Sequence, residues 1–169
     1  ILNSPNNPNG CVWPREMLEG IARLAVEKGF YVISDEIYEK LTYEGEHVSI
    51  ASLSPDIKAQ TIVVNGHSKA YAMTGWRVGY AAGPKDVIQA MSAHQSHATS
   101  NACSITQHAA MAALSSGGEI IAAMSEEFNE RRLLMDRLIN GIDGLSALLP
   151  KGAFYTMMNV SGAFGKALP

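Results

Sequence analysis

Short apolar runs that alternate with helical patterns constrain the fold of this chain more than any other feature. Residues 30–34 (FYVIS) and 61–65 (TIVVN) are rich in β-branched and aromatic side chains, and residues 77–82 form a third candidate strand. Apolar runs of this kind are typical of parallel strands that are buried on both faces. Because helical segments separate them, we expect an α/β fold with a mostly parallel sheet.

The helical segments are marked by their ends as well as by their periodicity. The first spans residues 14–29, where a proline starts the pattern, a glycine ends it, and the predicted buried face carries Met17, Ile21, Leu24 and Ala25. Further helices are expected near 84–97 and 104–115, and a long charged helix is expected from Glu119 to Gly141. The run ALLPKGAFYTMM that follows predicts another strand, with Met157 and Met158 in its core.

Composition excludes several classes of protein. The 169 residues are 47% hydrophobic with a mean hydropathy of +0.01 and a net charge of -3, and they are enough to bury a sizeable core. Mild acidity without a basic patch argues against nucleic acid as a partner. No apolar run reaches the length of a membrane span, and no signal peptide is recognisable. The two cysteines, Cys11 and Cys103, exclude a disulfide framework, so we expect a reducing, cytoplasmic location.

Asp35 ends the first apolar run and is a candidate ligand-binding residue. Carboxylates at the carboxyl ends of parallel strands lie where open α/β sheets bind ligands. A buried carboxylate needs a partner, and a protonated ring nitrogen of a cofactor would provide one. The alternative is that Asp35 caps a short helix that begins in EIYEK, and the two interpretations are equally supported. Tyr38 would face the same site from the first turn of that helix, or it would be a packed tyrosine.

Lys69 follows the second apolar run in a turn rich in glycine and serine, TIVVNGHSKAYAMTGWRVGY. A primary amine can form an imine with an aldehyde cofactor and can later be displaced by a substrate amine. Arg77 and Ser68 are candidate phosphate ligands, because a guanidinium binds phosphate oxygens through two hydrogen bonds and a hydroxyl adds a donor. A lysine, an acid, a phenol and a guanidinium are the groups that hold pyridoxal phosphate as a Schiff base. The alternative for Lys69 is a solvated surface lysine.

Four strings in order, NNPNG, SDEIYE, SKAYAMTGWRVGY and PKGAFY, resemble the class I and II (fold-type I) aminotransferases, and the bacterial-type aspartate aminotransferase branch most closely. The resemblance covers nearly the whole chain with its spacing preserved. It implies the fold of PLP-transferases of type I, with helices on both faces of the sheet. It also implies pyridoxal 5'-phosphate as cofactor, amino-acid and 2-oxo-acid substrates, and a homodimer when the protein is complete.

The resemblance assigns a role to each site residue. Lys69 would hold the cofactor and move a proton at the substrate's α-carbon, and Asp35 would pair with the ring nitrogen. Tyr38 and Asn7 would contact the phenolic oxygen, and Asn7 lies in an Asn-Pro-Asn-Gly sequence that is first of all a turn signal. Ser68, Lys69, Gly75 and Arg77 fit the phosphate signature SKxxxxxGxR. Two departures are Asn9 in place of the usual threonine and Gly66 where several members carry a second serine.

The resemblance also predicts how the chain is divided. Residues 1–125 would be the carboxyl-terminal part of the large cofactor-binding domain, and residues 126–169 the linking helix and the start of the small domain. The chain begins inside a motif without Met and ends at Pro169. It is therefore expected to lack the arginine that binds the substrate α-carboxylate and the upstream parts of the cofactor site. The isolated piece would be inactive.

Two alternative functions remain open from the sequence. A lyase or synthase on the same scaffold would use the same Lys69 and Asp35, and a non-catalytic regulator would keep the fold.

His94 and His97 have a helical metal-ligand spacing but no companion ligand, so no metal site is expected. His67 is expected to be a loop residue near Lys69.

The segment SAHQSHATSNACS, where one branch of aspartate aminotransferases carries an arginine for the distal carboxylate, contains none. Broader substrate specificity is therefore predicted, unless Ser96, His97 or an upstream cation replaces that arginine.

Overall fold

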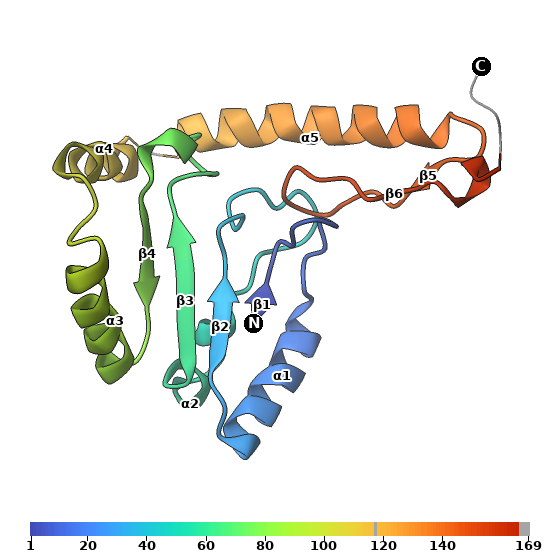
Figure 1. Cartoon of the computed structure of the whole chain (residues 1–169). Coiled ribbons are helices and arrows are strands. Elements are labelled where there is room, and N and C mark those ends of the chain that lie inside the picture. The colour runs from blue at the N-terminus through green and yellow to red at the C-terminus, as the bar shows by residue number, and fades with distance from the viewer. Residues whose placement is uncertain (117, 166–169) are drawn as a thin grey trace.

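The computed structural model describes residues 1–116 and 118–165, and its centre is a four-stranded sheet (Figure 1). The strands are β1 (Leu2–Asn3), β2 (Val32–Asp35), β3 (Thr61–Gly66) and β4 (Gly79–Ala82), in the spatial order β1-β2-β3-β4. The first three are parallel, and β4 pairs with β3 in the antiparallel direction. The predicted mostly parallel α/β sheet is confirmed, and its last strand is the exception.

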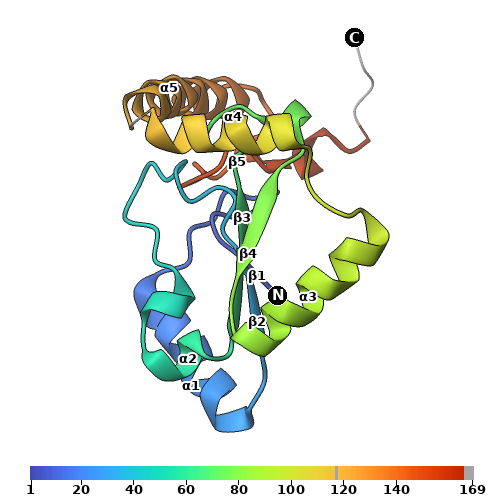
Figure 2. The same ribbon diagram turned by 90° about the vertical axis from the view of Figure 1, so that its left-hand side faces the viewer.

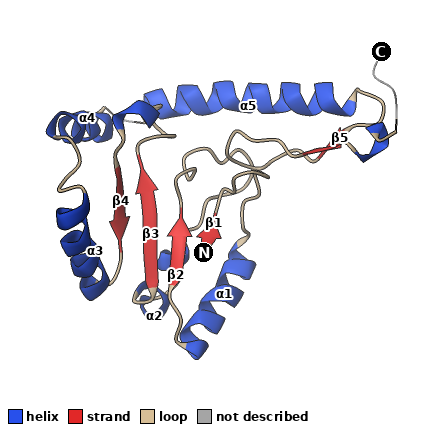
Figure 3. Ribbon diagram, in the orientation of Figure 1, coloured by secondary structure: helices blue, strands red, loops and turns tan. Residues whose placement is uncertain are grey.

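The helices agree closely with the expected segments (Figure 3). They are α1 (Arg15–Lys28), α2 (Pro55–Lys58), α3 (Lys85–Ala98), α4 (Ser104–Ser115) and α5 (Glu119–Asn140), and short 3-10 helices cover Ile50–Ser52, Thr74–Trp76 and Ser161–Ala163. Seen edge-on, the sheet has α1 and α2 on one side and α3 on the other (Figure 2). Helix α5 lies beyond the carboxyl ends of β2 and β3. No helix of the described residues is long and apolar enough to cross a membrane.

Helix α1 buries a stripe that matches the predicted one only in part, with Ala25 buried and Ile21 packed against the core as predicted. Leu18, Ala22 and Ala25 are buried, whereas Met17 and Leu24 are about half exposed, at 52% and 48%. Both stripes have helical spacing, so periodicity alone could not choose between them. The buried stripe packs with Val32 and the residues of α2 and its neighbouring 3-10 helix, in a core that holds Leu2, Leu18, Ala22, Ala25, Val32, Ile50 and Ile57. Gly29 ends the helix with a left-handed backbone (φ 68°), as glycine at this position commonly does.

The segment after α5 differs from the prediction. Within the described residues its strands are β5 (Ser146–Ala147) and β6 (Met158–Asn159), which pair with each other, and Met157 and Met158 are exposed. The long strand expected over this segment is therefore wrong. Residues 151–153 instead bond to two loops of the main sheet, because Lys151 and Gly152 N–H donate to the Gly10 carbonyl and Ala153 N–H donates to the Leu41 carbonyl. This segment is thereby held against the loops that follow β1 and β2.

Candidate functional site

The candidate site begins at the carboxyl end of β2. Asp35 is partly buried, and its carboxylate accepts a hydrogen bond from Ile37 N–H at 3.2 Å. Residues 37–40 form a turn and not a helix, so the expected helix after Asp35 is wrong. Asp35 still caps the backbone, but of a turn, because an aspartate side chain can accept a hydrogen bond from the backbone N–H two residues on. The carboxylate keeps further acceptor sites, so the cap and a ligand contact are compatible.

Asn7 is held close to this strand end by a short chain of hydrogen bonds. Asn7 N–H donates to Asn3 Oδ1 at 2.8 Å, and Asn3 Nδ2 donates to the Asp35 carbonyl at 3.1 Å. Ser4 N–H donates to the same Asp35 carbonyl at 3.2 Å. The predicted turn around Asn-Pro-Asn-Gly is confirmed, and Gly10 has a left-handed backbone there (φ 67°). The side chain of Asn7 is exposed, and it also bonds the Tyr38 hydroxyl.

Tyr38 is buried and lies in an aromatic cluster. Its ring meets Phe154 and Tyr155 edge-on, with centroids 5.4 and 5.5 Å apart, and its hydroxyl is hydrogen-bonded to the Tyr155 hydroxyl. Burial, the Tyr155 hydroxyl and the charge of Asp35 raise the pKa of Tyr38 far above its ordinary value, although the bond to Asn7 acts in the opposite direction. Tyr38 is therefore a neutral phenol at physiological pH, able to donate one proton in a hydrogen bond.

Lys69 lies in the turn that follows β3. Its Nζ is 5.8 Å from the centre of the Tyr38 ring and 5.7 Å from that of Phe154. Gly66 ends β3 just before this turn, where a Cβ would lie 3.0 Å from both Gly79 Cα and the Val78 carbonyl oxygen. Because β3 and β4 pair closely at this point, a serine side chain at position 66 would be crowded. The lysine expected from the sequence thus faces the same aromatic cluster as Tyr38.

A hollow of about 560 Å³ opens beside Lys69. Its wall combines the Lys69 turn with one face of α5, and it is lined by Ser68, Lys69, Ala72, Thr74, Ala123, Met124, Glu127, Phe128, Arg131 and Phe154. Five of these ten side chains are apolar. Arg131 is paired with Glu127 one helical turn earlier, with Nη2 and Nε both 2.8 Å from Oε1. The charge of Arg131 is therefore compensated within α5.

The two candidate phosphate ligands lie at opposite ends of the loop that follows β3. Ser68 lines the hollow, whereas Arg77 is exposed, has a left-handed backbone (φ 54°), and donates from Nη1 to the Thr74 carbonyl at 2.9 Å. Arg77 is not among the lining residues of that hollow. Phosphate binding by Ser68 and Arg77 together remains a prediction. Ser96 lines a separate hollow on α3, so it does not share the one beside Lys69.

Two contributors to the site were missed from sequence. Phe154 and Tyr155 contact Tyr38. Both belong to the PKGAFY string, which carries the family resemblance but has no local pattern that points to Tyr38. His67 lies in the loop after β3, as expected, and it is buried beside Tyr71 and Tyr80, with ring centroids 5.4 and 6.0 Å away. Within the described residues, neither ring nitrogen of His67 has a hydrogen-bond partner.

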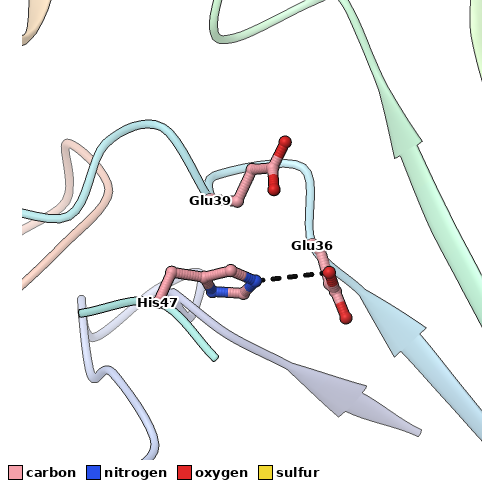
Figure 4. Close-up of side chains that lie close together, drawn as sticks. All are labelled: Glu36, Glu39 and His47. Carbon is pink, nitrogen blue, oxygen red and sulfur yellow. Dashed lines mark hydrogen bonds and ion pairs between the residues drawn. The ribbon is translucent and has the colours of Figure 1, made fainter. Parts of the chain in front are cut away.

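Glu36, next to Asp35, is the centre of a buried polar network (Figure 4). Its carboxylate accepts hydrogen bonds from the Ser34 and Ser49 hydroxyls at 2.8 and 2.7 Å, and lies 3.2 Å from His47 Nε2. Burial raises the pKa of Glu36, but the bonds from His47, Ser49 and Ser34 outweigh it, so the net pKa is below its ordinary value of 4.5. Glu39 lies close enough to complete a set of possible metal ligands. Because both Glu36 oxygens already have partners, we interpret the cluster as a structural brace.

Comparison with known proteins adds a family to this geometry. The sequence model described as "Aminotransferase class I and II" matches residues 1–168. An aspartate aminotransferase of Geobacillus stearothermophilus is 48% identical over 169 residues, which are 99% of this chain and 43% of that protein. The chain therefore spans less than half the length of this curated relative.

Solved structures agree with the sequence match. The crystal structure of an aspartate aminotransferase from Rhizobium meliloti superposes with a TM-score of 0.94 at 41% identity, covering 99% of this chain and 42% of that one. An aromatic aminotransferase from Pyrococcus horikoshii OT3 superposes with a TM-score of 0.88 at 42% identity, covering 92% of this chain and 42% of that one. Both the arrangement of elements and the sequence are thus shared with proteins of one family.

Proposed function

Because the chain belongs to the class I and II aminotransferases, we propose that it supplies the cofactor-binding half of an enzyme that transfers an amino group from an L-amino acid to a 2-oxo acid. The observation that carries this proposal is the position of Lys69. Its amine lies at the wall of a hollow, next to the ring of Tyr38 and at the end of the strand beside the one that carries Asp35. The aspartate aminotransferases among its relatives support aspartate-type substrates.

The residues at this end of the sheet fit pyridoxal 5'-phosphate. Lys69 would hold it covalently through Nζ, and Asp35 would pair with its ring nitrogen. The neutral phenol of Tyr38 and the amide of Asn7 would bind its phenolic oxygen. Ser68 and Arg77 would bind its phosphate. When bound, the cofactor supplies an electron sink that stabilises negative charge at the substrate's α-carbon.

Each residue then has a task that its own chemistry allows. When the cofactor is bound, Lys69 Nζ would accept the proton of the substrate's α-carbon and return it as a general acid. Asp35 would pair with the ring nitrogen, and the Tyr38 hydroxyl would donate one hydrogen bond to the phenolic oxygen. The side chains of Met124, Phe128 and Phe154, which line the hollow, would limit access of water to the reacting atoms.

We place the border between the two domains where the sequence suggested it, with residues 1–125 in the large domain and 126–169 leading into the small one. Residues 166–169 lie outside the described part of the chain. The complete protein is expected to be a homodimer, on the basis of its family. Both cysteines, Cys11 and Cys103, are exposed free thiols, which supports a reducing compartment such as the cytoplasm.

The test is the requirement for a 2-oxo acid, measured on the complete protein supplied with pyridoxal phosphate. An aminotransferase converts an amount of amino acid equal to its own sites and then stops until a 2-oxo acid is added. Continued turnover without an acceptor, with release of ammonia or of a side-chain fragment, would instead identify a lyase. Absence of any conversion with the cofactor bound would favour the non-catalytic regulator.

A further inference from the structure

The hydroxyl groups of Tyr38 and Tyr155 meet although the residues are 117 positions apart in the chain. Tyr155 reaches Tyr38 because residues 151–153 are bonded to the loops after β1 and β2. Tyr155 is partly buried and its ring also packs on Phe154, with centroids 4.8 Å apart. The contact is therefore built by long-range folding and is not a chance encounter of two surface side chains.

Either hydroxyl could be the donor of this hydrogen bond in this structure, so its direction depends on what else Tyr38 bonds. A phenol has one proton to donate and can accept further hydrogen bonds at its oxygen. If Tyr38 donates its proton to the phenolic oxygen of the cofactor, it can only accept from its other neighbours. The Asn7 side chain has an NH₂ group, and Tyr155 has a hydroxyl, so both can donate to Tyr38.

We propose that Tyr155 is a positioning residue that donates a hydrogen bond to the Tyr38 hydroxyl and so directs the single proton of Tyr38 toward the cofactor's phenolic oxygen. This inference rests on the proposed function. Hydrogen bonds in a chain polarise one another, so a donor behind Tyr38 strengthens the bond that Tyr38 makes in front. In this proposal Tyr155 acts only through Tyr38.

The test is Tyr155→Phe in the complete protein loaded with pyridoxal phosphate. This change removes the hydroxyl and keeps the ring contacts with Tyr38 and Phe154. The readout is the pH midpoint of the visible absorption change of the cofactor bound to Lys69. Hydrogen bonds to the phenolic oxygen stabilise the deprotonated form, in which that oxygen carries more negative charge. Losing Tyr155 as a donor weakens the Tyr38 bond without removing it, so the midpoint should rise by a fraction of what one hydrogen bond contributes, on the order of 0.2 pH units.

A double-mutant comparison separates this role from a merely structural one. Tyr38→Phe alone should raise the midpoint further than Tyr155→Phe. In the Tyr38→Phe background, Tyr155→Phe should add no further shift, because the residue through which it acts is gone. An equal shift in both backgrounds would overturn the proposal, and so would an unchanged midpoint in the single variant.

Tyr43→Phe is the matched control. The Tyr43 hydroxyl donates to the Ala153 carbonyl at 2.6 Å, so it holds the same segment without touching Tyr38 through its hydroxyl. This variant should lower thermal stability and leave the absorption midpoint unchanged. A shift in Tyr43→Phe as large as that in Tyr155→Phe would show that any loosening of the segment suffices, and would refute a specific role for Tyr155. If the wild-type protein takes up no cofactor at Lys69, the proposed function itself fails.

Discussion

Glu36 should contribute more to stability than any exposed glutamate, because it is buried with three partners. We predict that Glu36→Ala lowers the free energy of unfolding of the complete protein. The change removes acceptors from Ser34, Ser49 and His47, and it leaves the buried Ser34 hydroxyl without its partner. Hydrogen bonds to a charged group contribute about 1.5–3 kcal/mol each, and part of this offsets the desolvation of the carboxylate. We therefore expect Glu36→Ala to lower the free energy of unfolding by about 3 kcal/mol.

Glu36→Gln should lower the free energy of unfolding by less than Glu36→Ala does, because the amide oxygen still accepts hydrogen bonds from the serine hydroxyls. The measurement is urea-induced unfolding followed by far-ultraviolet circular dichroism. Glu46→Ala is the control, since Glu46 is exposed one residue before His47, and its change should stay within about 0.5 kcal/mol of wild type. A loss in Glu36→Ala no larger than in Glu46→Ala would refute the view that Glu36 braces the end of β2.

The pH dependence supplies an independent check with a defined sign. The pKa of Glu36 is lower in the folded protein than its ordinary value of 4.5. A carboxyl with a lowered pKa stabilises the fold above pH 4.5, and this contribution is lost as the pH falls through the folded-state pKa. The advantage of wild type over Glu36→Gln in the free energy of unfolding should therefore shrink as the pH falls below 4.5. An advantage that grows on acidification would contradict the assignment.

Three other outcomes are expected for the complete protein. Asp35→Ala should retain bound cofactor but lose several powers of ten in transamination rate, on the order of 4 kcal/mol or more, and wild-type turnover would leave Asp35 as a turn cap only. Comparison of kcat/KM should show measurable activity with phenylalanine and alanine beside aspartate, and strict dicarboxylate selectivity that vanishes on changing Ser96 or His97 would refute this. Gly152→Ala should destabilise by about 1–3 kcal/mol in thermal unfolding, because its Cβ would lie 2.7 Å from Pro5 Cβ, whereas Gly20→Ala in α1 should not.

The parts of the fold that depend on local pattern could be predicted from the sequence. The runs at 30–34 and 61–65 gave β2 and β3, and the polar residues that follow them, Asp35 and Lys69, lie at the same end of the sheet. Parallel strands bring their carboxyl ends to one edge, so this pairing follows from topology alone. The aminotransferase fold and family were also identified from four short strings.

Contacts between distant segments could not be predicted in the same way. The Tyr38–Tyr155 contact depends on residues 150–156 folding back across the loops after β1 and β2. The same segment looked like a strand because its side chains are apolar, but its backbone groups bond to Gly10 and Leu41. The Glu36 network is similar, because its partner His47 lies in a loop with no regular pattern. Hydrophobic periodicity shows which face of a helix or strand is buried, but it does not show which distant segment packs against that face.

The most direct test of this account is the identity of the lysine that holds the cofactor. The complete protein should be incubated with pyridoxal phosphate, reduced with borohydride, digested and analysed by mass spectrometry. The account predicts that the labelled peptide contains Lys69, and that Lys69→Ala, which can form no imine at that position, loses the label. A label on Lys40 or Lys85 instead, or one that persists unchanged in Lys69→Ala, would contradict the assignment of the whole site.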